Sequence, residues 1–256
     1  MQKRTLWQKI RRVWAVLGTL AFVVFAGWSL LAYRASATAR AALESDAAVE
    51  VTAQETHWTF TPMGGAHETG LVFFPGALVD PVAYAPFARD VASAGYPVAL
   101  VRVPRRGAFG GADGPEVLAR ARAAMQGRPG VTRWVTGGHS RGGVIASAFV
   151  RQDAARLAGL VLIGTSHPRD FSLAQLTVPV AKIYGTRDTI ADVEKIDATR
   201  SNLPPHTTWV RIDGGNHSQF GWYGFQPGDW PATITRQRQH VLTVAAVIAL
   251  LEQAGR

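Results

Sequence analysis

The sequence contains no cysteine, so the protein has neither disulfide bonds nor thiolate metal sites. It also lacks internal repeats, low-complexity tracts and the His and carboxylate spacings typical of metal sites. The glycine cluster at residues 107–111 does not have the G-x-G-x-x-G spacing of a dinucleotide site. We therefore expect no cofactor and no metal ion.

Acidic residues are missing from residues 1–34, which hold six of the basic residues. The formal charge of +9 comes mostly from this segment, because the remainder carries 21 basic against 18 acidic residues. A near-balanced domain does not present the basic surface that nucleic acids require. Nucleic acid is therefore not an expected partner.

Charge is absent from residues 13–33, and a helix of that length rises about 30 Å, enough to cross a bilayer. Because basic residues precede it, residues 1–12 are expected to form a cytoplasmic tail and residues 13–33 a transmembrane signal anchor. The alternative is a cleaved signal peptide with Ala35-Ser36-Ala37 as its cleavage site, but the run exceeds the usual apolar length of about 7–15 residues. The sequence predicts a domain on the extracytoplasmic side of a cell membrane, and the arginine- and alanine-rich composition favours a bacterial one.

Beyond the anchor, residues 34–48 are expected to be a linker with a helical spacer, and residues 49–256 one domain. Apolar or alternating runs predict strands at residues 49–53, 57–61, 71–74, 98–103, 131–136, 160–163, 180–184 and 208–212. Helical patterns lie between them, at residues 81–94, 116–126, from 144 onward, and 236–252. Such alternation predicts an α/β fold with a mostly parallel sheet covered on both faces.

The segment from Val131 to Gly143 contains a G-x-S-x-G pattern between a predicted strand and a predicted apolar helix. A serine on so sharp a turn needs a strained backbone, and larger residues at Gly138 or Gly142 would collide. The N–H of Arg141 then lies at the positive end of a helix, where an oxyanion is stabilised. The alternative interpretation is a glycine-rich turn without chemistry.

Four segments carry a resemblance to a known family: Phe73–Pro81, Gly137–Gly143, Tyr184–Asp188 and Gly214–His217. On these motifs residues 49–254 resemble the α/β-hydrolase superfamily. The short connection at residues 164–180 leaves no room for a large cap domain, so the chain looks like the small capless members grouped with dienelactone-hydrolase-like proteins. Those proteins use a cysteine nucleophile, whereas this chain has serine.

The resemblance implies a catalytic triad in the chain order nucleophile, acid, histidine. Ser140, Asp188 and His217 have this order, and each follows a predicted strand. Asp192 and Glu194 are alternatives for the acid. His139, which precedes the nucleophile, is expected to be structural because its side chain would point away from the serine.

The oxyanion hole implied by the resemblance has two backbone N–H donors, those of Arg141 and Ala77. Leu78 replaces Ala77 if the loop is one residue longer. Two further groups allow either a functional or a structural interpretation. Three arginines could steer an anionic substrate or form a solvated face: Arg102, Arg105 and Arg106. Five aromatic residues could wall an acyl pocket or pack a long loop: Phe220, Trp222, Tyr223, Phe225 and Trp230.

These features predict a membrane-anchored serine hydrolase that cleaves an ester or related acyl bond through an acyl-enzyme intermediate. An acyltransferase acting on a cell-envelope alcohol would use the same residues. A non-catalytic envelope-binding domain on a hydrolase scaffold is the alternative from another class, because a fold does not fix a function. The expected partners are a small acyl substrate and, through the N-terminal helix, the membrane.

Overall fold

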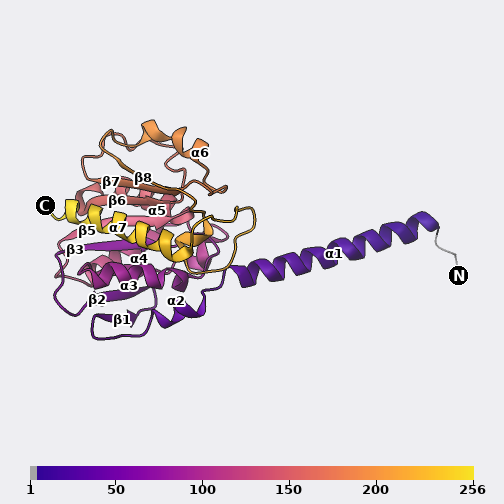
Figure 1. The fold of residues 1–256 in the computed structure, drawn as a ribbon, viewed down its shortest axis with the longest axis horizontal. Helices are drawn as coiled ribbons and strands as arrows, with labels where there is room; N and C mark the ends of the chain where they lie inside the picture. The colour runs from indigo at the N-terminus through magenta and orange to yellow at the C-terminus, as the bar shows by residue number, and fades with distance from the viewer. Residues whose placement is uncertain (1–4) are drawn as a thin grey trace.

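A sheet of eight strands forms the centre of the computed structural model, which describes residues 5–256 (Figure 1). The strand order is β1-β2-β4-β3-β5-β6-β7-β8. Strand β2 is antiparallel to both of its neighbours, β1 and β4, and β3 to β8 run parallel. The strands are β1 (Val49–Ala53), β2 (His57–Pro62), β3 (Thr69–Phe74), β4 (Val98–Val101), β5 (Arg133–His139), β6 (Leu157–Ile163), β7 (Val180–Gly185) and β8 (Thr208–Ile212).

Helices cover both faces of this sheet, as the alternating pattern predicted. On one face α3 and α7 pack over a core that includes Phe73 and Val247, and on the other α4 and α5 pack over a core that includes Phe74 and Phe149. The domain helices are α2 (Ala37–Ala41), α3 (Ala85–Ser93), α4 (Pro115–Gln126), α5 (Arg141–Gln152), α6 (Val193–Asp197) and α7 (Arg236–Ala254), with short 3₁₀ turns between them. The predicted α/β fold, with a mostly parallel sheet covered on both faces, is confirmed.

The central strands end side by side, which positions the site. Phe74 of β3 pairs with Gly138 of β5, and His139 pairs with Ile163 of β6. Because β3 to β8 are parallel, the loops that leave their carboxyl ends gather at one edge of the sheet. We call this the catalytic edge.

The helix expected at residues 81–94 is divided in two. A 3₁₀ turn occupies Pro81–Tyr84 and α3 begins only at Ala85. Pro86 explains the division, because proline has no N–H to donate to the preceding turn.

The N-terminal helix α1 (Leu6–Ala32) begins seven residues before the predicted anchor, so part of the predicted basic tail is helical, while residues 1–4 of that tail lie outside the described residues. Its stretch from Leu6 to Trp28 is long and apolar enough to cross a membrane. Residues 34–48 do not hold the domain at a distance: the side chain of Ser36 caps α2, and Ala39 is fully buried against the domain.

Candidate active site

Ser140 lies on the tight turn between β5 and α5 with φ 54° and ψ −119°, a conformation that non-glycine residues adopt only under constraint. Its N–H donates to the carbonyl of Ile163 at 2.9 Å, and its own carbonyl accepts from Gly143 N–H at 3.0 Å. Strand pairing on one side and the first turn of α5 on the other therefore hold the strained serine, and its side chain remains partly accessible.

The two glycines of the pattern allow this turn to close. A Cβ on Gly138 would overlap the backbone of Gly142, and a Cβ on Gly142 would overlap the carbonyl of Phe74 in β3. Both collisions are with backbone, which cannot move aside as a flexible side chain can. The steric reason inferred from the sequence thus applies in the fold.

Asp188 and His217 are brought together from loops 29 residues apart in the chain. Asp188 follows β7, and its Oδ2 lies 2.8 Å from His217 Nδ1. Its other oxygen, Oδ1, accepts from the N–H groups of Ile190 at 2.9 Å and Ala191 at 2.7 Å. Both side chains are fully buried, so the carboxylate is held in one orientation toward the imidazole.

The second ring nitrogen of His217, Nε2, is buried and has no hydrogen-bond partner among the described residues, Ser140 included. The ring packs against that of His139, the residue before Ser140, with ring centroids 4.4 Å apart. The imidazole thus lies beside the serine turn with one nitrogen fixed by Asp188 and the other uncommitted. A general base needs such a free nitrogen within reach of the proton that it takes.

Asp192 and Glu194, the alternatives for the acid, have other positions. Asp192 caps α6 by accepting from Lys195 N–H at 2.8 Å and also pairs with the Lys195 ammonium, and Glu194 lies in the first turn of that helix. The hydrogen bond to the histidine therefore distinguishes Asp188 from its neighbours.

A second buried carboxylate, Asp229, supports the histidine loop and was missed by the sequence analysis. It accepts from the N–H of His217 at 3.3 Å and from the N–H and Oγ of Ser218 at 2.8 and 2.6 Å. Asp229 is 4% exposed and lies twelve residues after the histidine. No motif surrounds it, so only the folded loop identifies its role.

Gln239 of α7 fixes the peptide before His217 from both sides. Its Oε1 accepts from Asn216 N–H at 3.0 Å, and its Nε2 donates to the Asn216 carbonyl at 2.7 Å. Asn216 also donates through Nδ2 to the carbonyl of Trp230 at 2.7 Å. The histidine therefore stands on a loop with little freedom, as a positioned base needs.

His139 is buried and belongs to a second hydrogen-bonded group. Its Nδ1 lies 2.7 Å from the hydroxyl of Tyr84, and that hydroxyl accepts from Gly76 N–H at 3.1 Å. Burial, and then the nearby His217, hold the pKa of His139 well below its ordinary value, so its ring stays neutral. Tyr84 thus connects His139, which precedes Ser140, to Gly76, which precedes Ala77.

The donors predicted for the oxyanion hole are free in the described part of the chain. Leu78 N–H donates to the carbonyl of Arg106 at 2.7 Å, so the alternative donor is occupied. Ala77 N–H makes no hydrogen bond to any residue from 5 to 256, and Arg141 N–H is the first of α5, where helical donors lack a partner. Ala77 follows β3 beside the serine turn, because Phe74 and Gly138 are paired.

The predictions for the three arginines and the five aromatic residues have different outcomes in the structure. Arg102 lies over the Trp58 ring at 3.7 Å, whereas Arg105 and Arg106 are exposed on the loop that follows β4. Phe220, Trp222 and Tyr223 pack into or against the core, but Phe225 and Trp230 are exposed. The aromatic cluster is thus mainly loop packing, with two residues presented outward.

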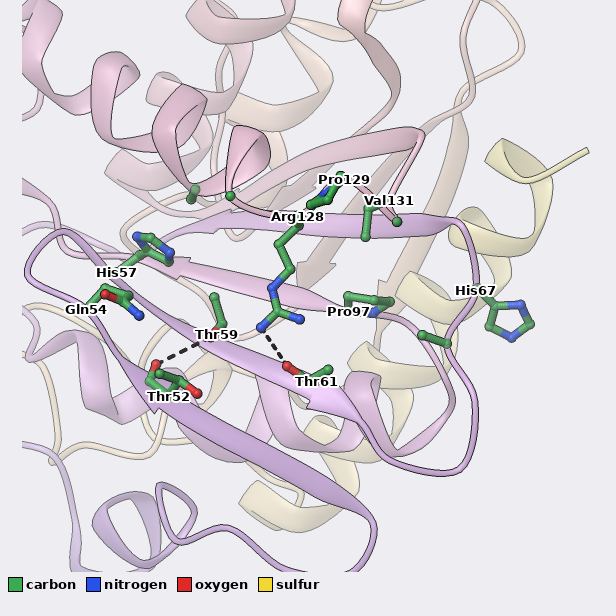
Figure 2. Close-up of a pocket in the computed structure, with 14 residues that line it drawn as sticks. Thr52, Gln54, His57, Thr59, Thr61, His67, Pro97, Arg128, Pro129 and Val131 are labelled. Carbon is green, nitrogen blue, oxygen red and sulfur yellow. Dashed lines mark hydrogen bonds between the residues drawn. The ribbon is translucent and has the colours of Figure 1, made fainter.

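A hollow of about 660 Å³ lies away from these residues, on the face of β1 and β2 beside the loop after α4 (Figure 2). Arg128 crosses it and donates to Thr61 Oγ1 at 2.6 Å. Its lining includes three threonines, two histidines and two prolines, and it contains neither a nucleophile held by a base nor a carboxylate. No cluster of three or more potential metal ligands occurs in residues 5–256.

Comparisons with known proteins agree with this geometry. A family model described as "Alpha/beta hydrolase family" matches residues 70–241, about two thirds of the chain. The chain belongs to the α/β-hydrolase family and is an enzyme of the hydrolase class. No curated protein sequence matches it.

Two solved structures are similar to this chain. One, a membrane phospholipase A described as a bacterial virulence factor, is 15% identical, with a TM-score of 0.55 over 95% of this chain and 99% of its own. The other comes from a study of two metagenome-derived lipolytic enzymes. It is 16% identical, with a TM-score of 0.48 over 60% of this chain and 87% of its own.

Proposed function

We propose that the protein is a membrane-anchored serine hydrolase that cleaves an ester or related acyl bond with Ser140, His217 and Asp188. The observation that carries the proposal is the buried pair of Asp188 Oδ2 and His217 Nδ1 at 2.8 Å, together with a serine on a strained strand-to-helix turn. The family assignment supports hydrolysis in general, and the membrane phospholipase A with the same fold is consistent with an ester substrate.

In this mechanism His217 Nε2 takes the Ser140 proton as Oγ attacks the acyl carbon. Asp188 keeps the proton of His217 on Nδ1 and stabilises the imidazolium without being protonated itself. The negative oxygen of the tetrahedral intermediate accepts from the N–H groups of Ala77 and Arg141. His217 then gives its proton to the leaving group, and water releases the acyl-enzyme by the same steps.

A labelling experiment tests the nucleophile. A fluorophosphonate probe is expected to label the wild-type protein and not Ser140→Ala, since the probe phosphorylates an activated serine. Ser140→Ala and His217→Ala are expected to lose about 10³-fold or more in kcat, and Asp188→Asn somewhat less, because the three act as a unit. Undiminished ester hydrolysis by Ser140→Ala would refute the assignment, and labelling absent from the wild type would favour a non-catalytic domain.

The anchor is supported by the way the helix joins the domain. Ala35, the first residue of the alternative cleavage site, is 4% exposed, and Ser36 N–H donates to the Trp222 carbonyl at 2.8 Å. Cleavage after Ala37 would remove both contacts. Retention of α1 therefore accounts better for the packing.

Orientation is tested with a reporter fused after Arg256 that is active only in the cytoplasm. The reporter is expected to be silent, because the basic residues before the apolar run stay on the cytoplasmic side. An active reporter would reverse the proposed orientation. A mature chain beginning at Thr38 would show cleavage.

A further inference from the structure

The carboxyl end of α1 is fixed to the domain by backbone hydrogen bonds. Gly224 N–H donates to the Ala32 carbonyl at 2.7 Å, and Asp80 N–H donates to the Tyr33 carbonyl at 2.9 Å. A Cβ on Gly224 would lie 2.8 Å from the Ala32 oxygen, so glycine is needed for this approach. The Tyr33 ring also stacks on Tyr223 with centroids 6.2 Å apart. The helix therefore sets the orientation of the domain.

The two loops that receive α1 are those that carry the site. One begins beside Ala77 and the other follows His217. Figure 1 shows α1 leaving the domain on the side away from the C terminus. The C terminus marks the opposite edge of the sheet, because Gly255 lies against Thr69, the first residue of β3. A membrane crossed by α1 thus lies on the side of the catalytic edge.

Exposed apolar side chains gather on the same edge. Outside α1, six large apolar residues are exposed among the described residues, and four of them lie on loops that leave the carboxyl ends of β3, β4 and β8: Leu78, Phe109, Phe225 and Trp230. Phe109 is 93% exposed, and its loop packs against the Ala77 loop, since a Cβ on Gly107 would lie 3.5 Å from Ala77 Cα. Exposed apolar residues on neighbouring loops indicate a surface that is covered in use.

Basic residues on the same loops and at the end of α1 indicate what covers this surface. Arg34 and Arg105 are exposed and have no ion-pair partner in the part of the chain described. The Arg187 guanidinium lies 5.2 Å from the Trp230 ring centroid. Tryptophan and arginine side by side are favoured at the level of lipid headgroups, where the ring enters the apolar boundary and the cation meets phosphate.

The length of α1 brings the edge to that level. The uncharged run from Val13 to Tyr33 rises about 30 Å, the thickness of a bilayer core, so a spanning α1 ends at the interface. The hydrogen bonds at Ala32 and Tyr33 leave no spacer between that end and the domain. The site loops must then lie within reach of the headgroups.

We propose that the catalytic edge rests against the bilayer that α1 crosses, and that the enzyme takes as its substrate an acyl ester of a lipid in that same bilayer. The lipid substrate rests on the proposed function, whereas the position of the edge against the bilayer does not. The partner that covers this edge is thus a lipid surface. The side chains that insert into it are those of Leu78, Phe109, Phe225 and Trp230.

For such a lipid, Ser140 Oγ forms a bond to the acyl carbon and the bond from that carbon to the alcohol oxygen breaks. The Ser140 proton passes through His217 to that oxygen, which leaves as a deacylated lipid. Water then attacks the acyl-serine, restores the Ser140 hydroxyl and releases a carboxylic acid. No oxidant or reductant takes part.

The first test measures how deeply the edge lies in the bilayer. Because the chain lacks cysteine, Phe109→Cys provides one labelling site, and Met63→Cys and Val241→Cys, both exposed but off the edge, are matched controls. Each full-length variant is labelled with a fluorescent dye and reconstituted in vesicles that carry nitroxide-labelled lipids. Several-fold stronger quenching at position 109 than at 63 and 241 is expected. Equal quenching at all three positions would overturn the membrane-facing edge.

The second test measures which lipids are cut. Vesicles that contain the enzyme carry one isotope-labelled phospholipid, and enzyme-free vesicles in the same tube carry another, with Ser140→Ala as the blank. Release of acid at least about tenfold faster from the enzyme's own vesicles is expected, because the anchored edge faces its own bilayer. Equal release from both would overturn the bilayer as the source.

The outcomes separate the two proposals. If Phe109→Cys is quenched and the fluorophosphonate labels Ser140, but no lipid of either vesicle is cut, the lipid substrate is wrong and the serine hydrolase stands. If neither labelling nor hydrolysis of any ester occurs, the proposed function fails together with the substrate. The quenching pattern still decides the orientation in that case.

Discussion

Tyr84 offers a test of whether the serine turn and the Ala77 loop act as one unit. Its hydroxyl is buried and accepts from Gly76 N–H at 3.1 Å. The phenolic proton then has one acceptor in reach, His139 Nδ1 at 2.7 Å, which places the His139 proton on Nε2. Tyr84→Phe removes both bonds and preserves the ring that packs on Phe73.

The magnitude follows from the two groups left behind. Gly76 N–H and His139 Nδ1 would both be buried without a partner, at about 1–3 kcal/mol each, or about 2–6 kcal/mol in total. For a domain of this size each kcal/mol lowers Tm by about 2–4 °C, so a fall of at least about 4 °C is expected. Removing an oxyanion donor costs about 10²–10³ in kcat, so displacing Ala77 N–H is expected to cost less, about tenfold.

The assay combines thermal unfolding with kinetics well below Tm, with rates normalised to sites labelled by the fluorophosphonate. A positioning role predicts a lower kcat per labelled site with KM little changed. Tyr96→Phe is the matched control: Tyr96 is 5% exposed and its hydroxyl makes no hydrogen bond within residues 5–256. If Tyr84→Phe matches Tyr96→Phe in both Tm and kcat, the coupling through Tyr84 is refuted.

Three further substitutions test separate parts of the site and the fold. Arg141→Ala is expected to keep most of the activity, since the backbone N–H is the proposed donor; a loss as large as that of Ser140→Ala would contradict this. Gly142→Ala is expected to abolish activity, or to prevent folding as judged by circular dichroism, because its Cβ overlaps the Phe74 carbonyl; an active, stable variant would show that the turn relaxes. Burial lowers the pKa of Lys182 from 10.5 to about 7, so between these values the unfolded state binds more protons and stability rises with pH. The urea midpoint of the wild type is therefore expected to rise relative to that of Lys182→Met between pH 7 and pH 10. A difference between the two midpoints that stays constant with pH would refute the free-energy cost of burying that ammonium.

The sequence determined those features that depend on local spacing. Gly138 and Gly142 around Ser140, between an apolar strand and an apolar helix, required the strained turn, because hard-sphere contacts between near neighbours decide it. The alternation of strands and helices likewise required a mostly parallel sheet, and the uncharged run at residues 13–33 a helix of membrane length.

The tertiary structure alone decided which distant groups meet. Asp188 rather than Asp192 reaches the histidine because the turn after β7 places it there, and Asp229, Gln239 and Tyr84 have roles that no local pattern announces. Hydrogen bonds between residues many positions apart depend on where whole strands end, not on spacing within a window. The same holds for the junction of α1 with the site loops, which turned a predicted spacer into a packed segment and gave the catalytic edge its direction.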